Sequence, residues 1–559
     1  MTRSRRRARH AAVRHASALA VACTMLFAAT GCGGGSHPAK GQGGQPQAEQ
    51  LPPPPPPKDP NTPAAPPLVL WAGVTPTGVV QVAQNDLRDY EHMTIASLQG
   101  LMARGSNELV WIRPNDGEPW LDYLSATRGI SVDTVFSALD MLARFQDKIP
   151  GYVRVDSLGN PHSINAGISQ AGHTGTIVID QREELHVATL GLPMLYDVTG
   201  YDEPRLLAEN PTGWNPSIVF EQKPDILPLL KDLPVLTGGF IYHAGEGRPP
   251  FAEQVLAAQP PGAYLLGWRG QNSEQPMVED ASLNSLSLVA CDQCQNLSTL
   301  AQFPFQPPPR PAPPPAPAVE NGTHYVSLMV TDGDNVGFLQ NTMWNEQYYG
   351  NGLRGAYPLT WEMSPSLVKF APPILEWYLS HATVNDSFVA GSSGKGYILP
   401  HLEPNLNRFL DETEPLLYES GLHIVTAIDD VPLSSGAYDS YANRASIDAV
   451  IAKIGPYYQA GDGAVRWVND KPIVSVRAAI WDDNLTPEQA ATAVNALPRA
   501  PGAGTNAVSI VVIHPFSRFG TPNNEYGLID VGRRFRDGLS THVHLVSIEQ
   551  AISLLHQLR

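Results

Sequence analysis

Short apolar runs alternate with amphipathic stretches throughout the C-terminal half of the chain. The apolar runs have the length of buried strands and fall at residues 325–330, 357–361, 387–390, 423–428, 473–480, 508–513 and 542–546. Stretches with helical spacing, such as 365–381 and 487–497, separate them. Strand–helix alternation repeated seven times is typical of a parallel sheet with crossover helices. We therefore expect an α/β fold with a (β/α) barrel of seven or eight strands at 320–559; an open doubly wound sheet is the alternative.

Residues 68–303 predict a separate, mixed α/β N-terminal module. Strand-like runs at 79–82 and 109–112 flank a stretch with helical spacing at 89–103. No glycine-rich nucleotide fingerprint opens a helix here, so a nucleotide partner is not expected. A proline-rich run then separates this module from the C-terminal half. Because proline lacks an amide donor and fixes its backbone, we interpret residues 304–319 as an interdomain linker.

The N-terminal residues resemble an export signal. In residues 1–31, six arginines precede an apolar stretch that is too short for an ordinary transmembrane helix. The sequence ATGC, which ends at Cys32, resembles the lipobox of bacterial lipoproteins; a plain cleaved signal is the alternative. Residues 32–67 are polar and then proline-rich, which predicts a disordered tether. We expect an exported lipoprotein in the cell envelope or periplasm, held at the membrane through lipid on Cys32 alone.

Net charge and cysteine content indicate which classes of binding partner and cofactor are expected. The net charge is −17, and without residues 1–31 the chain has 31 basic and 54 acidic side chains, or −23. Such a surface repels nucleic acid, so no nucleic-acid partner is expected, whereas neutral glycans are tolerated. The spacing of Cys291 and Cys294 could suit a redox or metal motif, but no second CxxC is present. A local disulfide or two thiols is the favoured interpretation, and no cofactor is expected.

Acidic side chains follow several predicted strands at the end where α/β folds place their active sites. Asp332 and Asp334 follow the first strand, Glu362 ends the second, Asp429 ends the fourth and His514 follows the sixth. In extended backbone, Asp332 and Asp334 would point the same way. Glycosidic cleavage needs two carboxyl groups, so Asp332, Asp334 and Glu362 are the catalytic candidates. Asp429 and His514 are candidates for substrate binding.

Glycine, aromatic and amide side chains supply further candidates for substrate binding. Gly394 and Gly396 lie in a loop, GSSGKGY, where glycine allows close approach of a ligand. Tyr397 and Trp361 could stack on sugar rings or fill the core. Asn335 could contact substrate or cap the following helix, in which case the preceding acids would serve a turn.

These motifs also carry a family resemblance. Residues 394–400, GKGYILP, match the pattern GxGYxYP except that Leu399 replaces the second tyrosine. Other stretches resemble the same family in order along the chain: 97–101, 292–298, 332–335, 358–361 and 385–391. The chain thus resembles the glycoside hydrolase family named for GxGYxYP. The resemblance implies an N-terminal module, a C-terminal hydrolase domain and a polysaccharide or oligosaccharide substrate. Leu399 lacks the hydroxyl and ring that tyrosine would offer a sugar.

Two other functions fit the same residues. A metal-dependent polysaccharide deacetylase would also carry an acidic pair after its first strand, but it needs a histidine pair after the second. This chain has Glu362 there and no histidine between His324 and His381, so we expect glycosidic cleavage without a metal. A non-catalytic glycan-binding lipoprotein could use the tryptophans of the C-terminal half: Trp344, Trp361, Trp377, Trp467 and Trp481. A binding module does not need acids that converge.

Overall fold

The computed structural model describes residues 51–559 apart from 271, 518 and 520–526. The predicted signal at 1–31 and the predicted lipid site at Cys32 lie outside the described residues. Within the described segments, no helix combines the length and apolarity needed to cross a bilayer.

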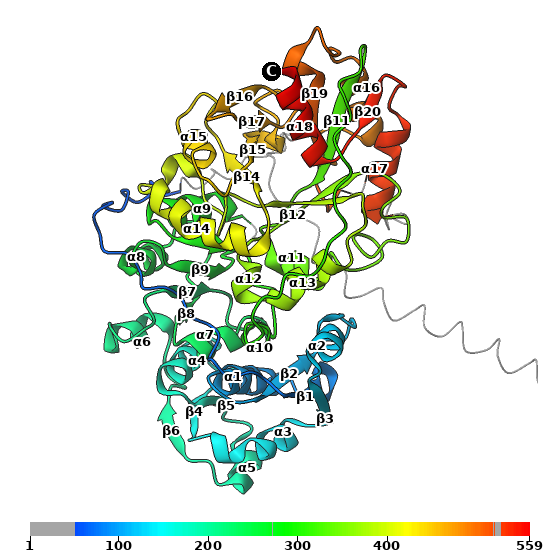
Figure 1. The fold of residues 1–559 in the computed structure, drawn as a ribbon. Helices are drawn as coiled ribbons and strands as arrows, with labels where there is room; N and C mark the ends of the chain where they lie inside the picture. Colours follow the sequence, from blue (N-terminus) through cyan, green and yellow to red (C-terminus); the bar gives the residue numbers. More distant parts are fainter. Residues whose placement is uncertain (1–50, 271, 518, 520–526) are drawn as a thin grey trace, which may run out of the picture. The chain divides into compact units, whose positions relative to one another are not determined.

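The N-terminal module contains three small parallel sheets in succession (Figure 1). The first has the order β2-β1-β3, with β1 at Gly78–Ala83, β2 at Glu108–Arg113 and β3 at Ser131–Val135. The second has the order β5-β4-β6, with β4 at Tyr152–Val155, β5 at Ile177–Asp180 and β6 at Met194–Asp197. The third has the order β10-β9-β7-β8, with β7 at Ile218–Glu221, β8 at Phe240–Tyr242, β9 at Tyr264–Gly267 and β10 at Ser287–Val289.

Helices connect these strands. They are α1 (Glu91–Ala103), α2 (Trp120–Arg128), α3 (Ala138–Arg144), α4 (His162–Thr174), α5 (Glu184–Val187), α6 (Glu203–Glu209), α7 (Asp232–Thr237), α8 (Pro250–Ala258), α9 (Glu274–Leu283) and α10 (Leu297–Leu300). Helix α1 is buried on nearly all sides, its polar His92, Thr94, Ser97 and Gln99 included. A Cβ at Gly100 would lie 2.2 Å from the carbonyl oxygen of Asp232, and one at Gly172 would lie 2.6 Å from that of Pro234. Glycine thus lets α1 and α4 both approach α7 closely, and the seam between the three sheets forms there.

One ten-stranded sheet organises the C-terminal half. Its order is β16-β17-β15-β14-β13-β12-β11-β19-β18, and β20 also pairs with β11. Every pairing is parallel except β16 with β17. The strands are β11 (His324–Val330), β12 (Leu359–Met363), β13 (Asp386–Ala390), β14 (Ile424–Asp429), β15 (Ala449–Ile454), β16 (Val465–Val468), β17 (Lys471–Ser475), β18 (Ala478–Ile480), β19 (Val508–Ile513) and β20 (Val543–Leu545).

The predicted strands are present, but the sheet differs from the expected form. The run at 473–480 divides into β17, which pairs with β15, and β18, which pairs with β19. Strands β15 and β16 were not predicted. The sheet is curled and mostly parallel; a closed barrel of seven or eight strands is not confirmed. Its helices are α11 (Val336–Asn341), α12 (Leu367–Phe370), α13 (Pro372–Ser380), α14 (Leu406–Ser420), α15 (Ala437–Ala442), α16 (Pro487–Asn495), α17 (Gly527–Asp537) and α18 (Ile548–Leu558).

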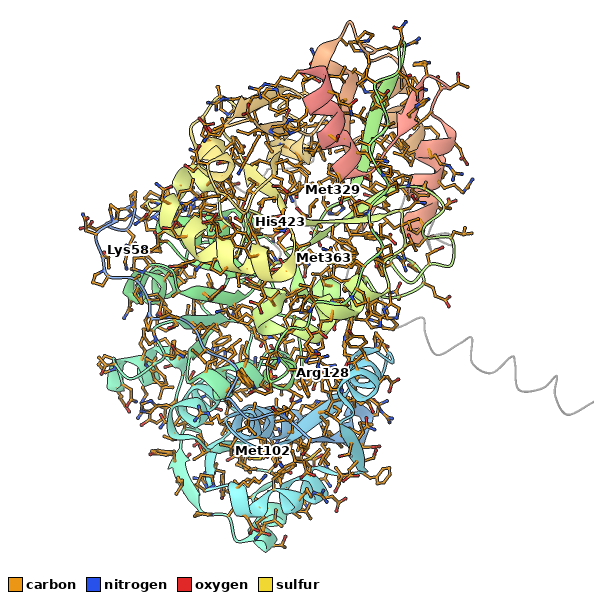
Figure 2. All side chains as sticks on the ribbon, in the orientation of Figure 1. Lys58, Met102, Arg128, Met329, Met363 and His423 are labelled. Carbon is orange, nitrogen blue, oxygen red and sulfur yellow. The ribbon has the colours of Figure 1, made fainter. Side chains whose placement is uncertain are left out.

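The described proline-rich segments lie against the folded body. The backbone amide of Lys58, labelled in Figure 2, donates to Leu283 at 2.8 Å. In the predicted linker, Pro315 accepts a hydrogen bond from the side-chain amide of Gln550 at 2.9 Å. Proline lacks the amide donor but keeps its carbonyl acceptor, which side chains of the body can reach. Residues 51–67 therefore differ from the free, disordered tether that composition suggested.

The N-terminal module also packs directly on the C-terminal half. Nη2 of Arg128 in α2, labelled in Figure 2, donates to both carboxylate oxygens of Glu376 in α13, at 2.6 and 2.7 Å. The ring of Trp120 meets that of Trp377 edge to face at 5.6 Å. This charge-assisted pair and the aromatic contact give the boundary a fixed geometry.

Candidate functional site

The loop after β11 places two aspartates beside the end of β12. A Cβ at Gly333 would lie 2.1 Å from the backbone oxygen of Glu362, so only glycine fits between the loop and this strand. Asp332, on one side of the glycine, has a left-handed backbone with φ 76°. The extended backbone assumed from the sequence is therefore not present. Asp332 and Asp334 both remain partly exposed to solvent.

Asn335 serves the structure of this loop. Its side-chain oxygen accepts a hydrogen bond from the Phe338 amide at 2.9 Å and caps α11, as the alternative interpretation of the sequence expected. Its side-chain nitrogen faces Asp332 Oδ2 at 3.4 Å. The cap therefore also touches one of the candidate acids.

Glu362 is buried and surrounded by donors. Its Oε2 accepts a hydrogen bond from the Gly333 amide at 3.2 Å, and its Oε1 accepts one from the Thr426 hydroxyl. Lys453 Nζ lies 2.6 Å from the same Oε1, and neither side chain of this ion pair is exposed. Three donors hold this buried carboxylate in one orientation. Glu362 thus organises the site and has little freedom to react.

Ser392 links this buried pair to the partly exposed acids. Its hydroxyl accepts a hydrogen bond from Lys453 Nζ at 2.7 Å and donates to Asp334 Oδ1 at 2.9 Å. It also lies 3.4 Å from Glu362 Oε1. The two carboxyl oxygens that share this hydroxyl are therefore at most about 6 Å apart. The hydrogen-bond chain from Lys453 through Ser392 to Asp334 fixes the orientation of the Asp334 carboxylate.

The pKa values of the two aspartates are both raised, to different extents. Burial raises the pKa of Asp332 well above its usual range, and the negative charges of Asp334, Glu274 and Glu362 add to the effect. Burial raises the pKa of Asp334 to about 6, while Lys453 opposes the rise and Glu362 adds to it. Asp332 is therefore the member of the pair that more strongly favours its protonated form, and Asp334 is the more readily ionised one. Two neighbouring carboxyls with separated pKa values are the arrangement of an acid and a base.

The third small sheet of the N-terminal module holds both site loops. Ala290, just after β10, accepts a hydrogen bond from the Val336 amide at 2.8 Å, and Leu288 accepts one from the Tyr397 amide at 2.7 Å. The Tyr397 hydroxyl donates to Glu274 Oε1 at 3.3 Å. Glu274 begins α9, and it is partly exposed. The N-terminal module thus contributes a carboxylate to the site.

Other segments of the chain, and not a ligand, occupy the space beside the glycines of the GSSGKGY loop. Gly394 has φ 124°, and a Cβ there would lie 2.9 Å from the Thr413 side chain. A Cβ at Gly396 would lie 2.9 Å from the Leu288 backbone oxygen. Leu399 is buried in an apolar cluster with Tyr397. Close approach at these positions is to neighbouring strands and helices, and Leu399 fills core space.

The remaining candidates fall into two groups. Trp361 is fully buried and its indole nitrogen donates to Asp386 at 2.8 Å, so its ring belongs to the core. Asp429 is also buried; its Oδ2 accepts a hydrogen bond from the His401 amide at 2.9 Å, and its Oδ1 pairs with the His401 ring. Burial raises the pKa of Asp429. Trp361 and Asp429 are therefore engaged in internal contacts.

His514 joins the site through aromatic rings. It stacks on Trp481 with ring centroids 3.9 Å apart and an interplanar angle of 9°. Trp481 meets Tyr458 at 5.6 Å, and Lys453 Nζ lies 5.0 Å from the Tyr458 ring centroid. Consecutive ring contacts thus connect His514, through Trp481 and Tyr458, to the buried Lys453.

Sequence reasoning missed four residues of this site: Glu274, Ser392, Thr426 and Lys453. Lys453 had a detectable signal, because it is a single charge in the apolar run AVIAKI of β15. A lysine in a buried strand needs a carboxylate partner, and the partner is Glu362. Glu274 had no such signal, since its proximity depends on how the third sheet packs.

The structure also bears on possible metal ligands and on the two cysteines. Among the described residues, no group of three or more His, Cys, Asp or Glu side chains is arranged to hold a metal ion. The ammonium group of Lys453 lies where a cation would neutralise Glu362. Cys291 and Cys294 are buried free thiols, the second of the two forms favoured from the sequence. Burial raises the pKa of Cys294, which disfavours the reactive thiolate.

Comparisons with known proteins agree with this architecture. Residues 322–511 match the GxGYxYP putative glycoside hydrolase C-terminal domain. Residues 79–147 match the first N-terminal domain of that family, which contains β1 to β3, and residues 216–302 match its third domain, which contains β7 to β10. No curated protein sequence matches the chain.

A solved structure has the same fold over most of the chain. It is a crystal structure of a putative hydrolase from Bacteroides thetaiotaomicron, with 26% sequence identity and a TM-score of 0.77. The similarity covers 88% of this chain and 98% of that one. Three domains of one family match in order along the chain, and this chain belongs to the GxGYxYP family.

Proposed function

We propose that the protein hydrolyses glycosidic bonds with Asp332 as general acid and Asp334 as the ionised partner. One observation carries the proposal: two adjacent, partly exposed carboxyls have separated pKa values, with Asp332 well above its usual range and Asp334 at about 6. The acid that protonates the leaving oxygen must keep its proton near neutral pH, and its partner must not.

In the proposed reaction, the Asp332 carboxyl donates its proton to the glycosidic oxygen as the bond to the anomeric carbon breaks. Asp334 either attacks that carbon or removes a proton from the attacking water. The hydrogen bond from Ser392 holds one Asp334 oxygen in place and leaves the other to react. Glu362 and Lys453 position this hydroxyl and do not contact substrate. Glu274 keeps Asp332 protonated by adding negative charge beside it.

The finer form of the fold is part of the proposal. Val476 donates its amide to Ala452 of β15 at 3.2 Å, and the next residue, Arg477, donates to Ile510 of β19 at 2.8 Å. We propose that residues 471–480 act as one bent strand that closes the sheet into a barrel. Asp332 and Asp334 would then lie at the carboxyl end of its first strand, where barrel enzymes carry out their chemistry.

The proposal is tested by measuring reducing-sugar release from a panel of polysaccharides and 4-nitrophenyl glycosides. Asp332→Asn and Asp334→Asn should each reduce kcat at least about a hundredfold, the usual contribution of a general acid or base. Asp448→Asn, an exposed aspartate before β15, is the matched control and should retain full activity. A chelator should leave the wild-type rate unchanged.

Other outcomes identify the alternatives. Acetate release that a chelator abolishes and a divalent ion restores would indicate the deacetylase. Full hydrolytic activity in both aspartate variants would leave those acids with a role in the turn alone. We also propose an envelope location through lipid on Cys32. Cys32→Ser should release the exported protein from the membrane fraction.

A further inference from the structure

A cavity of about 620 Å³ lies in the N-terminal module, where α1, α4 and α7 converge. Its walls come from three parts of the chain: residues 69–72, residues 213–216 and residues 236–238. The side chains of Arg104, after α1, and His173, in α4, complete the lining. None of the acids of the candidate active site lines this cavity.

The cavity has an unusual charge for this protein. The chain carries 54 acidic side chains, yet the described residues that line the cavity include no aspartate or glutamate and do include Arg104 and His173. Arg104 uses Nε and Nη2 to bind the backbone carbonyls of Val235 and Gly172. Across the described part of the chain it has no carboxylate partner, and its Nη1 makes no hydrogen bond.

A half-buried guanidinium without a counter-ion is electrostatically costly. Burial lowers the pKa of Arg104, and no neighbouring acid offsets the effect. The carbonyl contacts occupy Nε and Nη2 and fix the direction of the guanidinium. The Nη1 group is the donor left to pair with an oxygen of an anion such as a carboxylate.

Two tryptophans lie beside this arginine. Trp71 is 44% exposed, although tryptophan is usually well buried. The segment that carries it is held by a hydrogen bond from the Ala72 amide to Gln302 at 2.9 Å. The Trp214 indole nitrogen donates to the Asn210 carbonyl at 2.8 Å, and its ring packs between His173 and Phe240. Both aromatic surfaces are therefore fixed in place before a ligand arrives.

We propose that this cavity binds a glycan through a residue that carries a carboxylate, that is, a uronic acid. The carboxylate pairs with Arg104, and the apolar face of the sugar ring lies on Trp71. Asn215 and Thr237 also line the cavity, and hydrogen bonds to the surrounding backbone hold their side chains in place. The site holds an acidic glycan on the N-terminal module, and it does not depend on hydrolysis at Asp332.

The test uses the full chain carrying Asp332→Asn, so that no substrate is consumed. Trigalacturonic acid and its neutral methyl ester are titrated by calorimetry and by tryptophan fluorescence. The acid should bind at least about tenfold more tightly than the ester, and more weakly as salt rises. Trp71→Ala should weaken binding about tenfold. Phe136→Ala, an exposed aromatic of the same module outside the cavity, should change nothing.

Arg104→Gln should remove the preference for the acid over the ester while leaving the stacking contact. If that variant fails to fold, Trp71→Ala still tests whether the cavity binds the ligand, because an exposed side chain can be removed without loss of the core. Equal binding of acid and ester, no binding of either, or full affinity in Trp71→Ala would each overturn the proposal. Since the assay reads binding alone, its failure would leave the hydrolytic proposal untouched.

Discussion

Replacing Lys453 by methionine should expose how strongly the site depends on one buried ion pair. Lys453 Nζ lies 2.6 Å from Glu362 Oε1 and 2.7 Å from Ser392 Oγ, and neither member of the ion pair is exposed. Methionine fills similar volume but leaves Glu362 as a buried, unpaired carboxylate. Removing one partner of a buried pair costs about 3–5 kcal/mol. We expect the free energy of unfolding of the C-terminal half to fall by that amount.

Thermal unfolding measures this loss. For a region of this size, about 3–5 kcal/mol corresponds to a drop in Tm of about 6–20 °C. Adding Glu362→Gln to Lys453→Met should recover most of the stability, because the second change removes the unpaired charge. The matched control is Arg533→Ala, which breaks an exposed pair with Asp530 and should cost less than about 1 kcal/mol.

The double variant also separates stability from function. It should remain inactive, since no ammonium group would hold Ser392 against Asp334. If Lys453→Met unfolds no earlier than Arg533→Ala, the pair contributes little and the reasoning is refuted. If the double variant regains activity, Lys453 has no positioning role.

Three further predictions concern the same site. Asp332→Asn should gain stability relative to wild type as the pH rises from 4 to 8. The folded-state pKa of Asp332 is raised, so the stability from its bound proton is complete below the unfolded pKa and is lost as pH rises through the folded pKa. An unchanged Tm difference over this range would contradict the prediction. Glu274→Gln should move the alkaline limb of the pH–kcat/KM profile to lower pH, because it removes one negative charge beside Asp332; an unmoved limb would exclude that influence. Gly391→Ala should abolish activity and lower Tm, because its Cβ would lie 2.0 Å from the Glu362 side chain, whereas Gly352→Ala, with open space around it, should behave as wild type.

The strands of the C-terminal half were predictable because apolar runs signal them directly. Strand β15 was missed since a charge, Lys453, interrupts its apolar run AVIAKI, and the charge matters because it pairs with Glu362. The division of 473–480 into β17 and β18 depends on pairing with two different neighbours. Local sequence carries no signal for such a change of partner.

The acids at the strand ends were found from position alone, but their roles required the structure. Asp332, Asp334 and Glu362 look equivalent in the sequence. Burial and three donors make Glu362 an anchor, while burial, with like charges beside it, raises the pKa of Asp332. For Trp361 the sequence left sugar stacking and core filling both open, and the structure places it in the core. Burial of a side chain is a property of packing, which a single sequence does not encode in any local pattern.

The contacts from β10 to the two loops of the site bear on which segments of the protein can be expressed or exchanged as separate units. Expressed alone, the segment matched at 322–511 would lose the carbonyl partners of Val336 and Tyr397 and the Glu274 carboxylate. Such a fragment could keep its sheet and still lack an ordered active centre. Exchange of modules between relatives should therefore carry 216–302 together with the C-terminal half, as one functional cassette.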